Sequence, residues 1–367
     1  MKINNPKVTV ADDARIGVTE EVRSGFLDWL FTCNVTGDDG EHYEFGTSIL
    51  SMNVEQIDLV TMFLAKGYGY SEQLKNSIYK VGRYPGTIVN KRFSNPAGTL
   101  HVEQLEHKAV ITCLPYYKAE CYDDGSWHII ADSKDGFSLD IVHTGHGYPL
   151  WYGREKPSAL TQHSITYGYN WAGDVTGSFT YEGKTVKVKG TGQRERYVAV
   201  DSSAAELGGW EDWGYITFNE IHSSMYDMRL GMKDFSMFDL ENKKHFCEGK
   251  MEITHSDWVF VRTLDGFIPE KYHINIEVED GTYSIFAHTG NVRTWDVTFK
   301  VPDMPVATLA FDHVAGTFTD KQGNVRNLTG GNGVMSIRQW HAYPNILPRE
   351  LYSDEEVVPV DAKFETL

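Results

Sequence analysis

Cysteine is scarce in this chain and is never spaced for metal binding. The four cysteines among 367 residues are Cys33, Cys113, Cys121 and Cys247, and no two of them form a Cys-x-x-Cys motif. Zinc ribbons and dithiol redox sites need such pairs, so the sequence predicts neither a metal cluster nor a redox centre. Buried, reduced thiols are the expected state, which favours a cytoplasmic protein.

Long apolar runs are also missing, and basic residues are outnumbered. No stretch of about 18 apolar residues occurs, so we expect no membrane span. Residues 1–17 lack the apolar centre of a signal peptide, which again favours the cytoplasm. The chain has 34 basic and 51 acidic residues, for a net charge of −17. Such a surface repels phosphates, so nucleic acid is not an expected partner; solubility explains the charge most simply, with a basic protein partner as the alternative.

The motifs of the best-known cofactor and hydrolase sites are absent. The chain has no dinucleotide-binding glycine fingerprint, no phosphate-binding loop, no zinc-peptidase helix, no nucleophile elbow and no EF-hand loop. We therefore expect an activity without a cofactor and without a metal.

Hairpin signals are frequent, and they indicate an all-β fold. Asp-Gly or Glu-Gly turns at residues 38–40, 123–125, 182–183 and 279–281 separate stretches of alternating polarity. Many short antiparallel strands form sandwiches or up-and-down barrels, and a barrel of about eight strands can hold one small ligand. The 9 Trp, 20 Tyr and 18 Phe suit a cavity for an apolar ligand.

Helical spacing is confined to two segments, and the length indicates two domains. Apolar spacing predicts a helix over residues 54–66 and a shorter one over 71–80. One hydrophobic core rarely grows beyond about 250–300 residues. We therefore predict domains at 1–205 and 206–367, divided within the small and polar stretch 201–209.

Two polar clusters follow predicted strands in the first domain. His143 and His146 lie at a strand end and read either as loop histidines or as a proton donor at a barrel mouth. No third metal ligand is evident near them. Arg194, Glu195 and Arg196 read either as a solvated strand or as a charge-paired network lining a pocket.

A third cluster lies just beyond the domain boundary. Glu211 and Asp212 stand between Trp210, Trp213 and Tyr215. A carboxyl group packed on aromatic rings loses its hydration and holds its proton more tightly, as a general acid must. On a strand these two carboxyl groups point to opposite faces, so at most one enters a pocket. A surface turn flanked by core tryptophans is the alternative.

The order of motifs resembles a known family. An aromatic strand at Asp28-Trp29-Leu30-Phe31 precedes the Asp-Gly turn at 38–40, and Ser164-Ile-Thr-Tyr167-Gly-Tyr169, a hairpin at 175–183 and Gly190-Thr-Gly192 follow. Over residues 137–214 this resembles the tandem lipocalin-like proteins of the carotenoid 1,2-hydratase and AttH type, which include decalin-forming cyclases. The family's Asp-His-x-Trp-Gly signature is altered here, with residues 195–199 in its place or residues 211–214 supplying only Trp-Gly.

The resemblance implies an all-β fold of two lipocalin-like antiparallel barrels in tandem, and a hydrophobic small molecule as ligand. We predict a cofactor-independent lyase, a hydratase or dehydratase, that acts by acid/base catalysis on a terpenoid, phenolic or polyketide. The alternatives are an isomerase or cyclase on the same substrates, and a non-catalytic binder of a hydrophobic metabolite. A homo-oligomer stays open.

Roles for the candidate residues follow from these clusters. The predicted catalytic residues are Glu195, Glu211, Asp212, Arg194 and His146. The predicted substrate-binding residues are Tyr167, Tyr169, Trp171, Arg196, Trp210, Trp213, Tyr215 and His143.

Overall fold

The computed structural model describes most of the chain as β-strand. The described residues are 7–17, 25–52, 57–69, 71–72, 80–83, 87–159, 165–199, 211–228, 232–261, 266–296 and 305–338. Among them the only helix is the short α1 (Val10–Ala14), and no helix in these ranges has the length and apolar character to cross a membrane.

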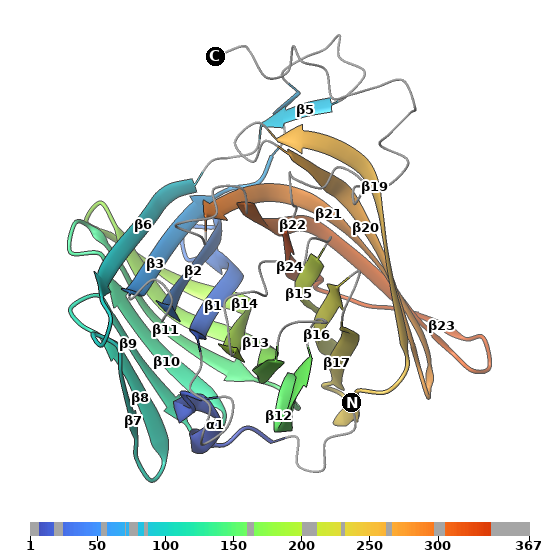
Figure 1. The fold of residues 1–367 in the computed structure, drawn as a ribbon. Coiled ribbons are helices and arrows are strands. Elements are labelled where there is room, and N and C mark those ends of the chain that lie inside the picture. The colour runs from blue at the N-terminus through green and yellow to red at the C-terminus, as the bar shows by residue number, and fades with distance from the viewer. Residues whose placement is uncertain are drawn as a thin grey trace, which may run out of the picture.

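The described strands form two curled sheets that lie side by side (Figure 1). The first sheet contains β1 (Phe26–Gly37), β2 (His42–Met52), β3 (Ile57–Lys66), β6 (Thr87–Pro96), β7 (His101–Gln104), β8 (Lys108–Cys113), β9 (Tyr117–Tyr122), β10 (Ser126–Asp132), β11 (Phe137–Gly145), β12 (Leu150–Ala159), β13 (Ile165–Tyr181) and β14 (Lys184–Ala199). Its strand order is β6-β3-β2-β1-β14-β13-β11-β10-β9-β8-β7, with β12 beside β13. Stacking of Phe93 on Tyr116, with ring centroids 4.0 Å apart, draws the two sides of this curl together.

The second sheet repeats this plan with one addition. It contains β4 (Ser71–Glu72), β5 (Lys80–Arg83), β15 (Glu211–Thr217), β16 (Ile221–Met228), β17 (Lys233–Asp239), β18 (Lys244–Phe246), β19 (Lys250–Val261), β20 (Gly266–Val278), β21 (Gly281–Asp296), β22 (Pro305–Asp320), β23 (Val325–Asn327) and β24 (Asn332–Arg338). Its order is β18-β17-β16-β15-β24-β22-β21-β20-β19-β5-β4, with β23 beside β22. The addition is the strand pair β4 and β5, which comes from the first half of the chain; β5 pairs with β19 in parallel and β4 pairs with β5.

The predicted all-β fold and its hairpins are confirmed. The turns at 38–40, 123–125, 182–183 and 279–281 join β1 to β2, β9 to β10, β13 to β14 and β20 to β21. Gly40 and Gly125 adopt φ of 80° and 86°, which L-residues with a side chain rarely adopt. The proposed domain boundary falls within residues 201–210, outside the described residues, and stays a prediction.

Both predicted helices are wrong where the structure describes them. Residues 57–66 form β3, which is buried on both faces. Val60, Met62 and Leu64 face the core of the first barrel, and Leu59 and Phe63 are buried on the other face. Burial on both sides removes the alternation that identifies a strand and leaves apolar spacing that imitates a helix. Ser71–Glu72 and Lys80–Arg83 are strands, and residues 73–79 lie outside the described residues.

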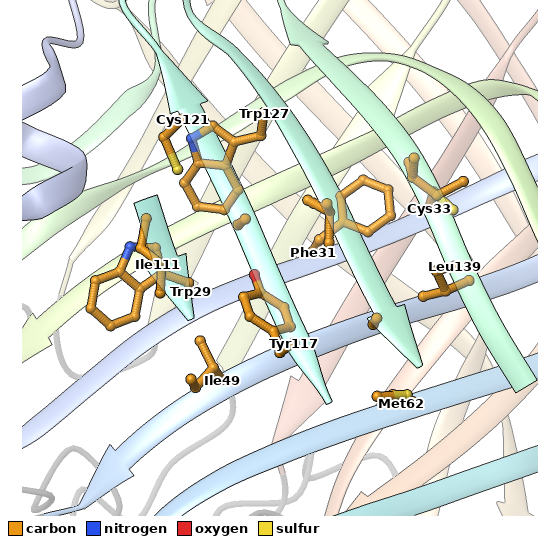
Figure 2. Packing of buried hydrophobic residues seen from close by; sticks show 14 of the residues in the cluster. Trp29, Phe31, Cys33, Ile49, Met62, Ile111, Tyr117, Cys121, Trp127 and Leu139 are labelled. Carbon is orange, nitrogen blue, oxygen red and sulfur yellow. The ribbon is translucent and has the colours of Figure 1, made fainter. Parts of the chain in front are cut away.

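Each sheet encloses its own apolar core, and the two sheets also pack against each other through their outer faces. The core of the first barrel is rich in aromatic and aliphatic side chains, including Trp29, Phe31 and Trp127 (Figure 2). We call the interface between the barrels the seam; it joins the outer faces of β13, β14, β1, β2 and β3 to those of β16, β15, β24, β22 and β21. Asn34 of β1 and Asn332 of β24 exchange hydrogen bonds across it, each 2.8 Å long. The seam is thus fixed by direct polar contacts as well as by packing.

A half-buried histidine on β18, His245, predicts loss of stability in acid. His245 contacts the Ser236 hydroxyl at 2.7 Å and the ring of Tyr148, and burial lowers its pKa to about 4. Because the unfolded chain takes up this proton near pH 6.5 and the folded chain only near pH 4, stability falls as pH drops through that window, by up to roughly 3 kcal/mol. Urea unfolding at pH 7 and pH 4.5 should show a smaller drop for His245→Gln than for the parent. His107→Gln, at an exposed site, is the control, and equal drops in both variants would contradict the assignment.

Candidate active site

The interior of the first barrel holds nearly half of the predicted site residues. They come from β11, β13 and β14, and each is at most 6% exposed: His143, Tyr167, Tyr169, Trp171, Arg194 and Arg196. Alternation along β13 and β14 sends these side chains inward and their neighbours outward.

The short helix α1 closes one end of this barrel and engages several of them. Tyr167 and Tyr169 donate hydrogen bonds to the carboxylates of Asp12 and Asp13. Asp13 also accepts a bond from the Trp127 indole at 3.2 Å. Burial raises the pKa of Asp13, an effect that Arg194 beside it opposes. The two tyrosines therefore hold α1 in place, which the sequence did not indicate.

Both interior arginines donate hydrogen bonds to backbone carbonyls and lie over tryptophan rings of the first barrel. Arg196 donates to the carbonyls of Asp28 and Tyr197 at 2.9 and 2.8 Å and lies 3.6 Å above the Trp29 ring. Arg194 donates to the Gly125 carbonyl at 2.8 Å. Its guanidinium lies within 5 Å of the Trp127 and Trp171 ring centroids. Because side chains alternate along a strand, both arginines lie on the face of β14 opposite to the one that carries Glu195.

His143 is also enclosed in this interior. Its Nε2 lies 3.4 Å from the Gly192 carbonyl, and its ring meets Phe31 edge to face. Burial, reinforced by Arg194, lowers the pKa of His143 well below its ordinary value, so the imidazole is neutral. It does not lie at a barrel mouth.

The third predicted cluster is divided by strand alternation. Asp212 points into the second barrel, is 1% exposed and contacts His255 Nε2 at 2.8 Å. Trp213 and Tyr215 point to the seam, where the Tyr215 hydroxyl donates to the Thr191 carbonyl at 2.8 Å. Glu211 is the first residue of β15, and Trp210 lies outside the described residues.

Glu195 lies in the seam with an apolar surrounding. It is 6% exposed, and Oε1 accepts a hydrogen bond of 2.7 Å from the Tyr152 hydroxyl. Its nearest cross-strand neighbours are Leu30 on β1 and Asn170 on β13. Around it packs a cluster shared by both sheets: Leu30, Leu150, Tyr152, Tyr197, Ala199, Trp213 and Tyr226.

Polar groups without partners accompany this carboxylate. Asn170 donates to Gln193 at 3.1 Å, but Asn170 Oδ1 and Gln193 Nε2 are buried and have no hydrogen-bond partner among the described residues. Thr32 of β1 lies opposite Gln193, and its hydroxyl is also buried without a hydrogen-bond partner among the described residues. Buried polar groups are almost always satisfied, so three such atoms on one face of the seam indicate a place for a polar ligand group or water.

A hollow begins at Leu30 and Thr32 and extends to Arg293 of the second sheet. The space between its atoms is about 230 Å³, and nowhere is it wide enough for a water-sized sphere. Ligand pockets usually measure several hundred Å³, so the expected roomy cavity is not found here. A ligand would have to displace side chains to occupy this hollow.

Arg293 belongs to a buried ion pair that spans the seam. Its Nε lies 3.6 Å from Oε1 of Glu44, and both side chains are at most 3% exposed. Burial raises the pKa of Glu44 to about 7, although Arg293 opposes the shift. Besides Glu195, the seam therefore contains Glu44, a carboxyl group that can gain or lose a proton near neutral pH.

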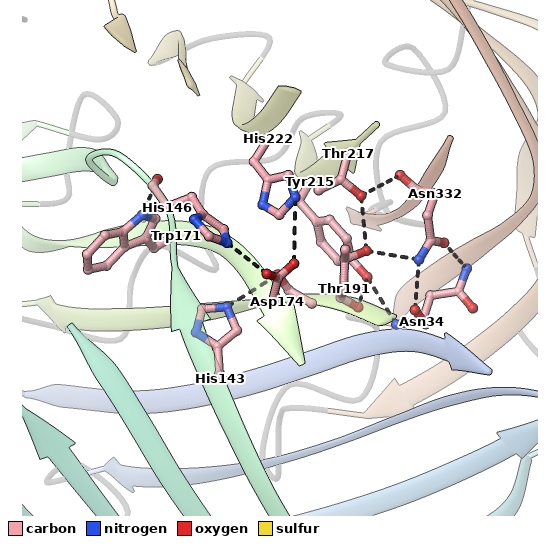
Figure 3. Close-up of polar contacts among 11 residues, drawn as sticks. Asn34, His143, His146, Trp171, Asp174, Thr191, Tyr215, Thr217, His222 and Asn332 are labelled. Carbon is pink, nitrogen blue, oxygen red and sulfur yellow. Dashed lines mark hydrogen bonds and ion pairs between the residues drawn. The ribbon is translucent and has the colours of Figure 1, made fainter. Parts of the chain in front are cut away.

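At the rim of the seam His146 lies close to Asp174 and His222, which no sequence pattern groups with it (Figure 3). His146 Nε2 lies 2.9 Å from Oδ2 of Asp174 on β13, and His222 Nε2 of β16 lies 3.9 Å from Oδ1. The hydrogen bond with His146 lowers the pKa of Asp174, and burial lowers the pKa of His222 to about 4. The rim thus gathers two imidazoles and one carboxylate.

Solved structures with this architecture exist, although no family model and no curated protein matches the sequence. An AttH-type protein from Nitrosomonas europaea superposes with a TM-score of 0.58 at 13% identity, over 92% of this chain and 98% of that one. Kievitone hydratase from Nectria haematococca gives 0.58 at 11% identity, over 92% and 94%. CghA with Sch210972 gives 0.56 at 8% identity, over 92% and 97%.

The chain has the tandem lipocalin-like fold. The resemblance seen in the sequence is confirmed at this level, and identities of 13% or less carry the likeness no further than the fold. Within the tandem lipocalin-like fold, the seam is where both barrels contribute side chains to one surface. Tyr152, Asn170, Gln193, Glu44 and Arg293 were missed, because their grouping depends on how the two sheets pack.

Proposed function

We propose that the protein is a cofactor-independent lyase of the hydratase or dehydratase type, acting on a hydrophobic small molecule in the seam. Glu195 is the proposed acid/base, and Tyr152 orients its carboxyl group. Trp213, Tyr226 and Leu30 would contact the apolar part of the substrate. Terpenoids, phenolics and polyketides with a hydroxyl group or a double bond fit this description.

One observation carries the proposal: a buried carboxyl group stands in an apolar cluster beside unsatisfied polar groups. Glu195 combines 6% exposure with a hydroxyl donor 2.7 Å away and orphaned amide atoms on Asn170 and Gln193. A carboxyl group in this setting is suited to proton transfer, and the amide groups are suited to hold a substrate oxygen. The residues that the sequence grouped with it on β14 face the other way.

The reaction needs only this chain's residues and water. In dehydration, protonated Glu195 gives its proton to the substrate hydroxyl, the C–O bond breaks and water leaves. The resulting carboxylate takes a proton from the adjacent carbon, which forms the C=C bond and restores the acid. Hydration is the same sequence in reverse.

The alternatives, an isomerase or cyclase and a non-catalytic binder, would use the same site. The same proton transfer without loss of water gives an isomerase or cyclase. A non-catalytic binder would hold a hydrophobic metabolite against the same apolar cluster without any proton transfer. Kievitone hydratase shares the fold and by its name is a hydratase, which supports the lyase reading by analogy alone.

A product-mass experiment separates these functions. We expect the purified protein to convert at least one member of a panel of hydroxylated and unsaturated terpenoids, phenolics and polyketides, with a mass change of one water. Chromatography with mass detection, with heavy-oxygen water for additions, measures it. A product of unchanged mass would instead establish the isomerase or cyclase, and ligand-induced stabilisation with no product would establish the binder.

A further inference from the structure

Three metal-ligating side chains meet at the rim of the seam, and they come from both barrels. His146 follows β11, Asp174 lies on β13 and His222 lies on β16. Their ligand atoms all lie within 4.8 Å of one another, and Figure 3 shows both imidazoles directed at the carboxylate between them. We propose that His146, Asp174 and His222 form a zinc-binding site that joins the two barrels.

The ligand set matches zinc better than the other common ions. Two imidazoles and one carboxylate are a known protein ligand set for zinc, with bonds of about 2.0–2.2 Å. Calcium and magnesium prefer oxygen ligands throughout, and copper(I) prefers sulfur. The separations of 2.9 and 3.9 Å from the two Asp174 oxygens bracket the spacing of ligands around such an ion, so small side-chain rotations suffice.

The state of His222 is an independent indication. This side chain is 5% exposed, yet Nδ1 is buried without a hydrogen-bond partner among the described residues, and Nε2 lies 3.9 Å from Asp174, beyond hydrogen-bond range. A buried imidazole nitrogen without a hydrogen-bond partner loses its hydration without compensation. A coordinate bond from this imidazole to an ion would offset that loss.

The surroundings of His146 hold it ready for the same ion. The Trp171 indole donates a hydrogen bond of 2.9 Å to the His146 carbonyl, and the indole ring lies directly over Gly145. The backbone is thus fixed just where the imidazole leaves it, which is how outer contacts orient metal ligands. Asp174 is 56% exposed, so an ion can enter from solvent and keep water in its remaining positions.

Zinc titration of untagged, chelator-treated protein tests the site. We expect one zinc ion per chain by calorimetry, and a rise in Tm with zinc, because an ion that binds only the folded state stabilises it. His146→Gln and Asp174→Asn should each weaken binding by more than about tenfold, the cost already seen when only an outer partner of a metal ligand is lost. Both positions are partly exposed, so these variants should fold.

His128→Gln is the matched control. His128 pairs with Asp140 at 2.8 Å on the same sheet, but no second histidine joins them among the described residues. This variant should bind zinc like the parent, and so should Glu195→Gln, which separates the metal site from the proposed lyase chemistry. Absence of zinc binding, or binding that His146→Gln and Asp174→Asn leave unchanged, would overturn the proposal.

Discussion

Replacing Glu195 by Gln should reduce turnover by about 100- to 10,000-fold, the range that a positioned general acid or base contributes. Gln keeps the shape of the side chain and can still accept the Tyr152 hydrogen bond, so substrate affinity should change little. The loss should therefore appear in kcat and not in the dissociation constant of the substrate. The dissociation constant can be measured from the ligand-induced shift in Tm.

Two further variants make this result specific. Tyr152→Phe removes only the orienting hydroxyl and should cost roughly fivefold to tenfold, the value of one hydrogen bond. Glu120→Gln makes the same chemical change on β9, where Glu120 pairs with Lys108 outside the seam, and should leave turnover intact. Parental turnover in Glu195→Gln would rule out Glu195 as the acid/base.

Replacing Asp13 by Ala should destabilise the protein by about 3–5 kcal/mol, the usual cost of removing one partner from a buried charged network. The change leaves the Tyr169 hydroxyl and the Trp127 indole without their acceptor. It also removes the carboxyl group that interacts with Arg194 and Arg196 in the barrel interior.

Denaturant unfolding followed by tryptophan fluorescence measures this loss, since Trp127 lies against the altered site. Asp13→Asn preserves the acceptor oxygen and should lose less, which separates the role of charge from that of hydrogen bonding. Asp140→Asn, at a 66% exposed position on the same barrel, is the control. A loss below about 1 kcal/mol in Asp13→Ala would show that α1 does not anchor the barrel.

Hairpins were predictable because their signals are local. A turn such as 38–40 needs a glycine with positive φ next to residues that tolerate a tight reversal of the chain, and these residues are adjacent in the sequence. β3 was not predictable in this way. Its residues contact the barrel core on one side and are buried on the other, and neither partner is near in sequence.

The candidate site shows the same division. Alternation implies that Glu195 and its two arginine neighbours point apart, but the sequence does not say which face is the barrel interior. Pairing of Glu44 with Arg293, or of Asp174 with His222, depends on contact between sheets built from distant segments. The acid/base candidate was therefore within reach of sequence reasoning, and its surroundings were not.

The parallel strand β5 has a consequence for how this chain can be made and divided. It covers the edge of β19 at residues 259–261 with residues that leave the ribosome long before β19 is synthesised. During synthesis the first half must keep this strand available while its own barrel closes, because pairings so distant in sequence form late. A chain cut between the barrels would strip β19 of its cover and leave an open edge that recruits other strands. The two barrels share one strand order, but the second sheet also depends on strands from the first half of the chain.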